Sequence, residues 1–284
     1  MELTDELLDI EVLERSSASI AARYQAAAPF PHVVLDGVLR PDAVERAYGE
    51  FEAADPEAWT NYIHVNERKF ATRDSSTWGP ALREVAGSLM SDRFVSFLRR
   101  VTGFEQLVPD ATMDGGGLHR SLAGGYLNVH ADFTAHHAQR TWHRRVNVLL
   151  YLNRVWQPCW GGNLELWATD MSRCVQSIAP LGNRLVIFTT SETSYHGHPE
   201  PMTCPDDVAR QSLALYYFTE EPNPPTHATN YRPRPTDGRA SAAAIYADNQ
   251  AVHLHDVMKR RFRVSDEAVG RWLGRVSRVR RPRP

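Results

Sequence analysis

The chain has 284 residues, of which 42% are hydrophobic, 23% charged and 10% aromatic, and its formal net charge is −2. This composition is typical of a globular protein with a hydrophobic core and excludes wholesale disorder and collagen-like or fibrous repeats. No stretch approaches the ~20 apolar residues of a membrane-spanning helix, and the acidic start MELTDELLDIEVLER is unlike a signal peptide, which together favour a cytoplasmic protein.

The charge is unevenly distributed along the chain. Residues 257–284 contain ten basic and two acidic residues, a local net charge of +8 against about −10 for the rest. Apolar residues interrupt the arginines in VMKRRFRVSDEAVGRWLGRV. We therefore expect a basic helical tail that docks on the body of the protein and regard nucleic-acid binding as unlikely, with binding of another polyanion as the alternative.

Three cysteines, Cys159, Cys174 and Cys204, form no CxxC pair and therefore predict neither a disulfide framework nor a zinc knuckle.

The first part of the chain, residues 1–110, is predicted to be mainly helical. Residues 1–28 have apolar side chains at roughly helical spacing, and prolines follow at 29 and 31. A first strand is expected over 31–39 and an amphipathic helix from Pro41, since proline is favoured at a helix start. A further helical block covers about 79–102, with Ser91 as a candidate N-cap and Gly103 as its stop.

Residues 115–220 change to short apolar or alternating runs separated by turns, which indicates strands. Seven such runs are GGLHRSL, GGYLNVHADF, RRVNVLLYLN, NLELWA, CVQSIAP, NRLVIFTT and QSLALYYFT. The absence of helical patterns between them predicts an antiparallel sandwich or barrel, and hence an α+β fold. Residues 221–284 are expected to form an irregular segment and the basic tail, and we expect residues 1–284 to form a single domain.

The residues that suggest chemistry lie in and after these strands. His130 and Asp132 are two apart in an alternating run and share a face. His196 and His198 follow the apolar strand NRLVIFTT, and either would complete a set of two histidines and one carboxylate. That set is typical of non-haem Fe(II) oxygenases, with zinc as the competing metal.

A basic residue for a carboxylate-bearing co-substrate begins the last strand. Arg210 and Ser212 share a face of RQSLALYYFT, and a buried arginine beside a hydroxyl would hold a carboxylate. A metal-chelating keto-diacid has such a carboxylate, so this pair favours iron oxygenase chemistry over zinc.

Taken in order, these motifs resemble the prolyl 4-hydroxylase type of Fe(II)- and 2-oxoglutarate-dependent dioxygenases. The resemblance covers about 115–219 and comprises His-x-Asp, a Tyr-Leu-Asn strand, a Gly-Gly-x-Leu strand, a distal His and Arg-x-Ser. It implies a double-stranded β-helix, or jelly roll, with flanking helices. It also implies Fe(II) bound by His130, Asp132 and His196, with His198 as the alternative to His196.

The same resemblance assigns the co-substrate pocket. Arg210 matches the residue that binds the far carboxylate of 2-oxoglutarate, with Tyr151 and Ser212 as further donors, and Leu149 and Leu164 match apolar walls. The implied reaction hydroxylates an unactivated C–H bond while 2-oxoglutarate and O2 become succinate and CO2, with ascorbate as a candidate additional requirement. Asp132 argues against the related halogenases, which have a small residue there, and Tyr216 replaces an arginine of the nucleobase demethylases.

Substrate contacts are expected from FTAHHAQRTWHRR, which in relatives lies beside the iron. The candidates are His136, His137, Arg140, Trp142 and Arg144, with Asn61, His64 and Lys69 on the opposite wall. Two arginines there favour an anionic target. We expect an amino-acid-like, peptidyl or natural-product substrate, with a peptidyl-prolyl 4-hydroxylase as the first alternative and a non-enzymatic jelly-roll binding module or a polyanion-binding protein as further ones. The oligomeric state has no signal in the sequence.

Overall fold

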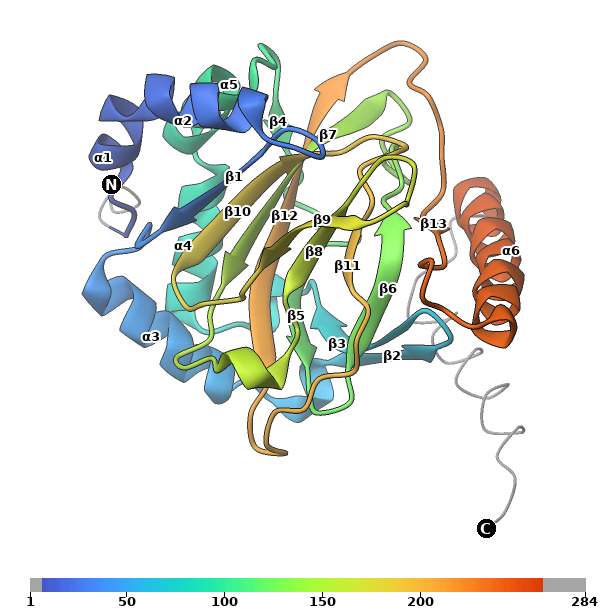
Figure 1. The fold of residues 1–284 in the computed structure, drawn as a ribbon. Coiled ribbons are helices and arrows are strands. Elements are labelled where there is room, and N and C mark those ends of the chain that lie inside the picture. Colours follow the sequence, from blue (N-terminus) through green and yellow to red (C-terminus); the bar gives the residue numbers. More distant parts are fainter. Residues whose placement is uncertain (1–6, 263–284) are drawn as a thin grey trace.

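One curled antiparallel sheet dominates the structure, a computed structural model that describes residues 7–262, with side chains through residue 250. Its strands are β1 (His32–Asp36), β2 (Thr60–His64), β3 (Glu67–Thr72), β4 (Val108–Pro109), β5 (Gly117–Ser121), β6 (Tyr126–Ala131), β7 (Trp142–Tyr151), β8 (Leu164–Trp167), β9 (Cys174–Ile178), β10 (Arg184–Thr189), β11 (His196–His198), β12 (Arg210–Glu220) and β13 (Asn230–Tyr231). The order is β1-β10-β7-β12-β5-β3-β6-β11-β8-β9, with β2 on β3, β4 on β12 and β13 on β6 (Figure 1).

The sheet curls over, so that β8 and β9 face β7 and β10. Between them lies an apolar cluster of Phe30, Tyr151, Leu164, Leu166, Ile178, Val186 and Phe188. This is the curled sheet expected of a double-stranded β-helix with flanking helices, and the predicted fold class is confirmed.

Five helices pack on the outer face of the sheet at the β1-β10-β7-β12 end (Figure 1): α1 (Ile10–Arg15), α2 (Ser17–Ala26), α3 (Pro41–Glu52), α4 (Pro80–Met90) and α5 (Asp92–Thr102). Because strand side chains alternate between faces, Val146, Val148 and Leu150 of β7 join the helical core, as Leu213, Leu215 and Tyr217 of β12 do. The alternate residues of both strands therefore face the inside of the curl, where the candidate site lies.

The helix α6 (Arg239–Phe262) lies at the opposite side of the molecule, beside β13 and β6 (Figure 1). Its Asn249 accepts a hydrogen bond from the Tyr231 backbone N–H at 3.0 Å and donates to the Asn230 side-chain oxygen at 3.0 Å. Within residues 7–262, no helix combines the length and hydrophobicity that a membrane crossing requires.

All seven strands predicted within 115–220 are present, as β5, β6, β7, β8, β9, β10 and β12. The predicted block at 79–102 is two helices that meet at Ser91, whose hydroxyl accepts from the Phe94 backbone N–H at 3.3 Å, and Gly103 ends α5 at φ +80°. The three cysteines are free.

Several elements were not predicted: the β2–β3 hairpin within the supposedly helical first part, the short strands β4, β11 and β13, and a start of α6 as early as Arg239. Short or polar strands give no apolar alternation, which is the signal used to find strands. The docking expected for the basic tail concerns residues 257–284, which lie largely outside the described residues and wholly outside the described side chains.

Candidate metal centre and co-substrate pocket

The structure brings together three metal-ligating side chains predicted from the sequence. His130, near the end of β6, and His196, at the start of β11, are paired residues of neighbouring strands with ring centroids 4.5 Å apart. Asp132 follows β6 directly, and one ligand atom from each of the three lies within 4.8 Å of the others. The alternative ligand, His198, lies outside this cluster.

Both histidines present the same ring nitrogen to the cluster. Nδ1 of His130 lies 2.9 Å from the Asn128 carbonyl oxygen, and Nδ1 of His196 lies 2.9 Å from that of Ser194. Since a carbonyl only accepts hydrogen bonds, Nδ1 carries the proton in each ring and Nε2 is free to bind a metal. Burial lowers the pKa of His196 to about 4, so this imidazole is neutral, as a metal ligand must be.

The carboxylate of Asp132 is fixed from behind. Its Oδ2 accepts hydrogen bonds from Arg144 Nη2 at 2.9 Å and from Asn147 Nδ2 at 2.7 Å. Burial alone would raise the pKa of Asp132, but the Arg144 guanidinium and the neighbouring histidines hold it well below its usual range. A charged carboxylate with one oxygen already occupied leaves Oδ1, which lies 3.5 Å from His130 Nε2, for a metal.

Arg144 itself is 1% exposed. Its Nε donates to the Asn147 side-chain oxygen at 2.8 Å, and its guanidinium carbon lies 3.3 Å from the centre of the Tyr216 ring and 4.7 Å from that of Phe133. The structure thus places this predicted substrate residue behind Asp132. The sequence analysis did not identify Asn147, although a polar residue on the inward face of the apolar strand VNVLLY indicates a polar partner inside the fold.

A buried cation lies on the same inner face. Arg210 is 7% exposed, and its guanidinium donates to the Gly162 carbonyl oxygen at 2.7 Å and to the Tyr151 hydroxyl at 3.0 Å. In the described part of the chain it makes no ion pair with a carboxylate. Ser212 is paired with Tyr151 across neighbouring strands, so the three residues predicted to hold the far carboxylate lie together.

Two further histidines, neither predicted to bind the co-substrate, lie near Arg210. His119 is paired with Ser212 across β5 and β12. Burial, helped by the nearby positive charge of Lys69, lowers the pKa of His119 to about 3. Burial, helped by the positive charge of Arg210, holds the pKa of His198 well below its usual range. The buried Nδ1 of His198 has no hydrogen-bond partner among the described residues. The carboxylate that acts on His119, Glu67, pairs with Lys69 at 2.9 Å, so among the described residues no carboxylate pairs with Arg210.

Apolar side chains connect this pocket to the metal cluster. Leu164 belongs to the apolar cluster between the two halves of the curl, and Leu149 packs against it. Phe188 of the same cluster lies edge-on to His196, with ring centroids 4.7 Å apart. A ligand between His196 and Arg210 would be surrounded by apolar side chains.

The donor set fits Fe(II) and 2-oxoglutarate. Two neutral imidazoles and one carboxylate are the ligands that non-haem Fe(II) oxygenases use. A buried arginine without a carboxylate partner is unfavourable unless a ligand supplies the negative charge. The histidine and carboxylate ligands alone would also suit zinc, but Arg210 adds a partner for the second carboxylate of a metal-chelating keto-diacid.

The remaining predicted substrate residues are mostly held by other parts of the protein. His136 is 2% exposed, and its Nδ1 accepts from the backbone N–H groups of residues 138 and 139 at 3.0 and 2.9 Å. His137 Nδ1 lies 2.5 Å from Asp114, and Trp142 packs on His136 and Phe218. Arg140 is exposed and lies in the turn that precedes β7.

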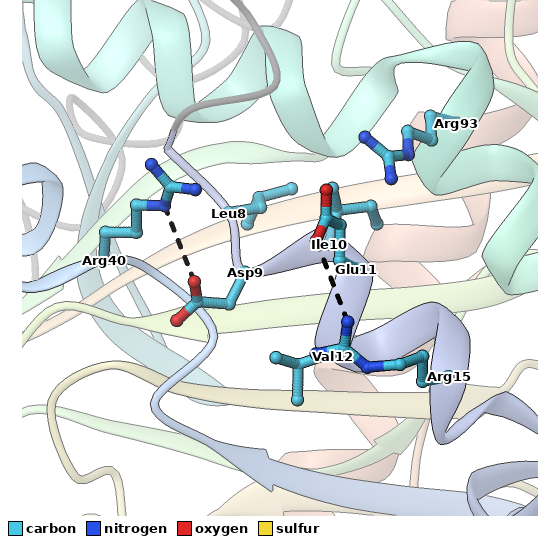
Figure 2. Close-up of a pocket in the computed structure, with 8 residues that line it drawn as sticks. All are labelled: Leu8, Asp9, Ile10, Glu11, Val12, Arg15, Arg40 and Arg93. Carbon is cyan, nitrogen blue, oxygen red and sulfur yellow. Dashed lines mark ion pairs between the residues drawn. The ribbon is translucent and has the colours of Figure 1, made fainter.

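A cavity of about 510 Å³ is lined by residues of and around α1 (Figure 2). The helix α1 lies on the side of the molecule away from β6 and α6 (Figure 1). Four of the charged residues that line it pair with one another, Arg40 with Asp9 at 3.5 Å and Arg15 with Glu11 at 3.8 Å (Figure 2). The fifth, Arg93, pairs with Glu14 at 2.8 Å. None of the residues predicted to bind the metal, the co-substrate or the substrate lines this cavity.

Comparison with known proteins agrees with this geometry. Residues 116–218 match the family model described as the 2OG-Fe(II) oxygenase superfamily. A curated relative, the prolyl 3-hydroxylase OGFOD1 of Mus musculus, is 25% identical over 236 residues, which are 79% of this chain and 40% of the relative. The chain thus spans about two fifths of the length of that relative.

Two solved structures share the fold. A prolyl hydroxylase of Trichoplax adhaerens, in complex with a hypoxia inducible factor peptide fragment, has a TM-score of 0.55 and 17% identity over 74% of this chain and 92% of its own. A Pseudomonas putida prolyl-4-hydroxylase has a TM-score of 0.51 and 19% identity over 71% of this chain and 98% of its own. The sequence and structural neighbours are therefore prolyl hydroxylase-like, and residues 116–218 are similar to the 2OG-Fe(II) oxygenase superfamily.

Proposed function

We propose that this protein is a 2OG-Fe(II) oxygenase that hydroxylates an unactivated C–H bond of an amino-acid-like, peptidyl or natural-product substrate. The single observation that carries the proposal is a buried arginine, Arg210, that has hydrogen bonds but no carboxylate partner on the same inner face as a His-Asp-His cluster. A dicarboxylic co-substrate that chelates the metal at one end and meets this arginine at the other accounts for both features.

In this proposal His130 and His196 hold the metal through Nε2, with their Nδ1 protons fixed on backbone carbonyls. Arg144 and Asn147 keep Asp132 charged and in one orientation. Fe(II) with 2-oxoglutarate and O2 supplies the oxidation of the C–H bond when bound. The protein contributes the fixed positions of these ligands, which removes much of the entropic cost of orientation.

The far end of the co-substrate is held by Arg210, with the Tyr151 and Ser212 hydroxyls as further donors. Gly162 permits this arrangement because a Cβ there would lie 3.2 Å from Arg210 Cδ and 2.7 Å from the Met202 sulfur, at a backbone φ of +69°. Leu149, Leu164 and Phe188 exclude water, which strengthens the ionic contact between Arg210 and the carboxylate.

The test needs no knowledge of the substrate. Anaerobic addition of Fe(II) and 2-oxoglutarate to the apo-protein should produce a visible metal-to-ligand charge-transfer band. We expect no band in His130→Ala and, in Arg210→Ala, a band that requires ~30- to 5,000-fold more 2-oxoglutarate, because truncating one partner of a buried charge pair costs about 2–5 kcal/mol. Arg210→Lys should lie between, since it keeps the charge and loses the bidentate geometry.

The matched control is Arg46→Ala, which removes an arginine of α3 that pairs with Asp42 and Glu84 on the protein surface. This variant should titrate like the wild type. Tight zinc in the purified protein together with no band in the wild type would contradict the proposal.

A second candidate is a peptidyl-prolyl hydroxylase that acts on a protein. It is favoured by the names of the relatives, which are prolyl 3- and 4-hydroxylases. Succinate release stimulated by proline-containing peptides, and mass spectrometry of those peptides for a gain of one oxygen, would distinguish it from an enzyme that acts on a small molecule.

A further inference from the structure

His198, the last residue of β11, is a buried histidine for which the fold supplies no hydrogen bond. It is 5% exposed, its Nδ1 is fully enclosed, and neither ring nitrogen has a partner among the described residues. The other buried histidines of the described chain each have one; they are His32, His130, His136, His143 and His196. An unpaired buried polar group costs stability and needs an explanation.

The strand pairing places the His198 side chain on the inner face of the curled sheet. His198 is two residues after His196 on β11, and side chains two apart on a strand share a face. Across the strands, His198 is paired with Leu127 of β6, and Leu127 is paired with Glu67 of β3. The ring of His198 therefore lies on the same inner face as the metal cluster, one step along β11 from it.

The same inner face continues around the sheet to Arg210. Ser212, two residues after Arg210 on β12, is paired with His119 of β5, and His119 is paired with Ala71 of β3. Lys69 is two residues before Ala71 and shares its face. The inward side chains of β12, β5, β3 and β11 thus surround one space, with Arg210 on one side and the metal cluster on the other.

The charged groups around His198 are cations. The charge that acts on it most strongly is that of Arg210, followed by those of Lys69, His130 and His119. Arginine and lysine side chains can only donate hydrogen bonds, so neither Arg210 nor Lys69 can accept the ring N–H of His198. A ligand that satisfies this N–H must bring an acceptor, and beside two cations the favourable acceptor is an anion.

Packing alone gives no reason for a histidine at this position. The neighbouring walls of the pocket are apolar and include Leu149, Leu164 and Phe188. An apolar side chain of similar volume would fill the space without an unpaired nitrogen, whereas a ligand that accepts a hydrogen bond accounts for the imidazole.

We infer that His198 is a further co-substrate-binding residue, whose Nε2–H donates a hydrogen bond to the far carboxylate of 2-oxoglutarate beside Arg210. Nε2 takes this role because Nδ1 is enclosed by the protein. The inference rests on the proposed function, because it takes 2-oxoglutarate as the ligand between Arg210 and the metal cluster. It gives His198 a role other than that of the alternative metal ligand.

The test separates binding of the far carboxylate from metal binding and from folding. His198→Leu fills a similar space without a hydrogen bond, and His198→Gln keeps an N–H donor. The Fe(II) charge-transfer band is titrated with 2-oxoglutarate and with 2-oxopentanoate, which has the same metal-chelating keto acid and no far carboxylate. Co(II) affinity without co-substrate and the melting temperature of the apo-protein are measured on the same variants.

The matched control is His143→Leu. His143 is 7% exposed, but its Nδ1 lies 3.2 Å from a Glu221 oxygen, so it has the partner that His198 lacks. We expect the apo-protein of this variant to melt below the wild type and its band to need no more 2-oxoglutarate.

For His198→Leu we expect the band to need about 10- to 150-fold more 2-oxoglutarate, which corresponds to a lost hydrogen bond to a charged group. The titration with 2-oxopentanoate and the Co(II) affinity should match the wild type. The apo-protein should melt no lower than the wild type, because the change removes an unpaired buried group. His198→Gln should need an intermediate concentration of 2-oxoglutarate.

A wild type without the band defeats the proposed function itself. With the band present, four results for His198→Leu each overturn the inference alone: an unchanged requirement for 2-oxoglutarate, an equal loss with 2-oxopentanoate, weaker Co(II) binding, or an apo-protein that melts below the wild type. The second and third would place the effect at the metal, and the fourth would make it one of folding.

Discussion

At the scale of single residues, the contact between Arg144 and Asp132 has the clearest consequence. Replacing Arg144 with methionine keeps much of its length but leaves the half-buried Asp132 without its cation and Asn147 without one partner. Since outer partners of metal ligands typically contribute ~10–100-fold to affinity, we expect metal affinity to fall by about that factor. A Co(II) titration followed by the visible absorption of the bound ion measures it.

The adjacent Arg145 is the matched control. It lies on the same strand, but it binds Thr219 at 2.9 Å and pairs with Glu221, away from the metal cluster. Arg145→Met should bind Co(II) like the wild type. Equal metal affinity in both variants would mean that Arg144 has no part in positioning Asp132.

Linear motifs predicted the ligands but not their supports. His130, Asp132, Arg210 and Tyr151 were predicted because each belongs to a short pattern within one strand or its end. The role of Arg144 depends on a turn that returns the chain so that β7 begins beside Asp132. The contact of the Tyr231 ring with His130, at 5.3 Å between ring centroids, depends on β13 pairing with β6. No spacing in the sequence encodes such contacts between distant segments.

At the scale of elements, the docking of α6 onto the β2–β3 hairpin should depend on pH. Burial alone would lower the pKa of His64, but its contacts with Asp248 of α6 and Glu67 of β3 raise it to about 9 from an ordinary 6.5. The other groups that face this pair are Lys69, which binds Glu67 at 2.9 Å, and the ring of Tyr231. A raised pKa gives stability that is complete below about pH 6.5 and is lost as the pH rises through about 9.

We therefore expect His64→Gln to lower the melting temperature by about 2–6 °C at pH 6.5, and the difference from the wild type to shrink toward zero at pH 10. Thermal unfolding at both pH values measures the two differences. His227→Gln is the control, since His227 pairs with Glu192 at an exposed site and does not contact α6. A difference for His64→Gln that stays constant with pH would contradict an ionic role for this histidine.

The strands that were predicted and those that were missed differ in the pattern of their apolar side chains. The strands β7, β10 and β12 alternate apolar residues toward the helices and were found for that reason. The β2–β3 hairpin instead carries His64, Glu67 and Lys69, which pair with one another and with α6, so its sequence has no apolar period. Similarly, β11 is three residues long and includes the candidate ligand His196. These strands were missed because their side chains form ion pairs or are candidate metal ligands, so polar residues stand where the apolar alternation would be.

At the scale of the whole molecule, the metal cluster and Arg210 lie on different strands of one curled sheet, so a ligand that spans them should stabilise the entire fold. Binding at 100 times the dissociation constant contributes about 2.7 kcal/mol, which is an increase of about 5–10 °C in melting temperature for a chain of this size. We expect Co(II) and 2-oxoglutarate together to raise the melting temperature by more than the sum of their separate effects, because each completes the site of the other.

Glutarate, which has both carboxylates and no keto group for chelation, should add little. Both His130→Ala and Arg210→Ala should lose the excess, the first by removing a metal ligand and the second by removing the partner of the far carboxylate. Strictly additive shifts in the wild type, or an undiminished excess in Arg210→Ala, would show that the two regions do not bind one ligand between them.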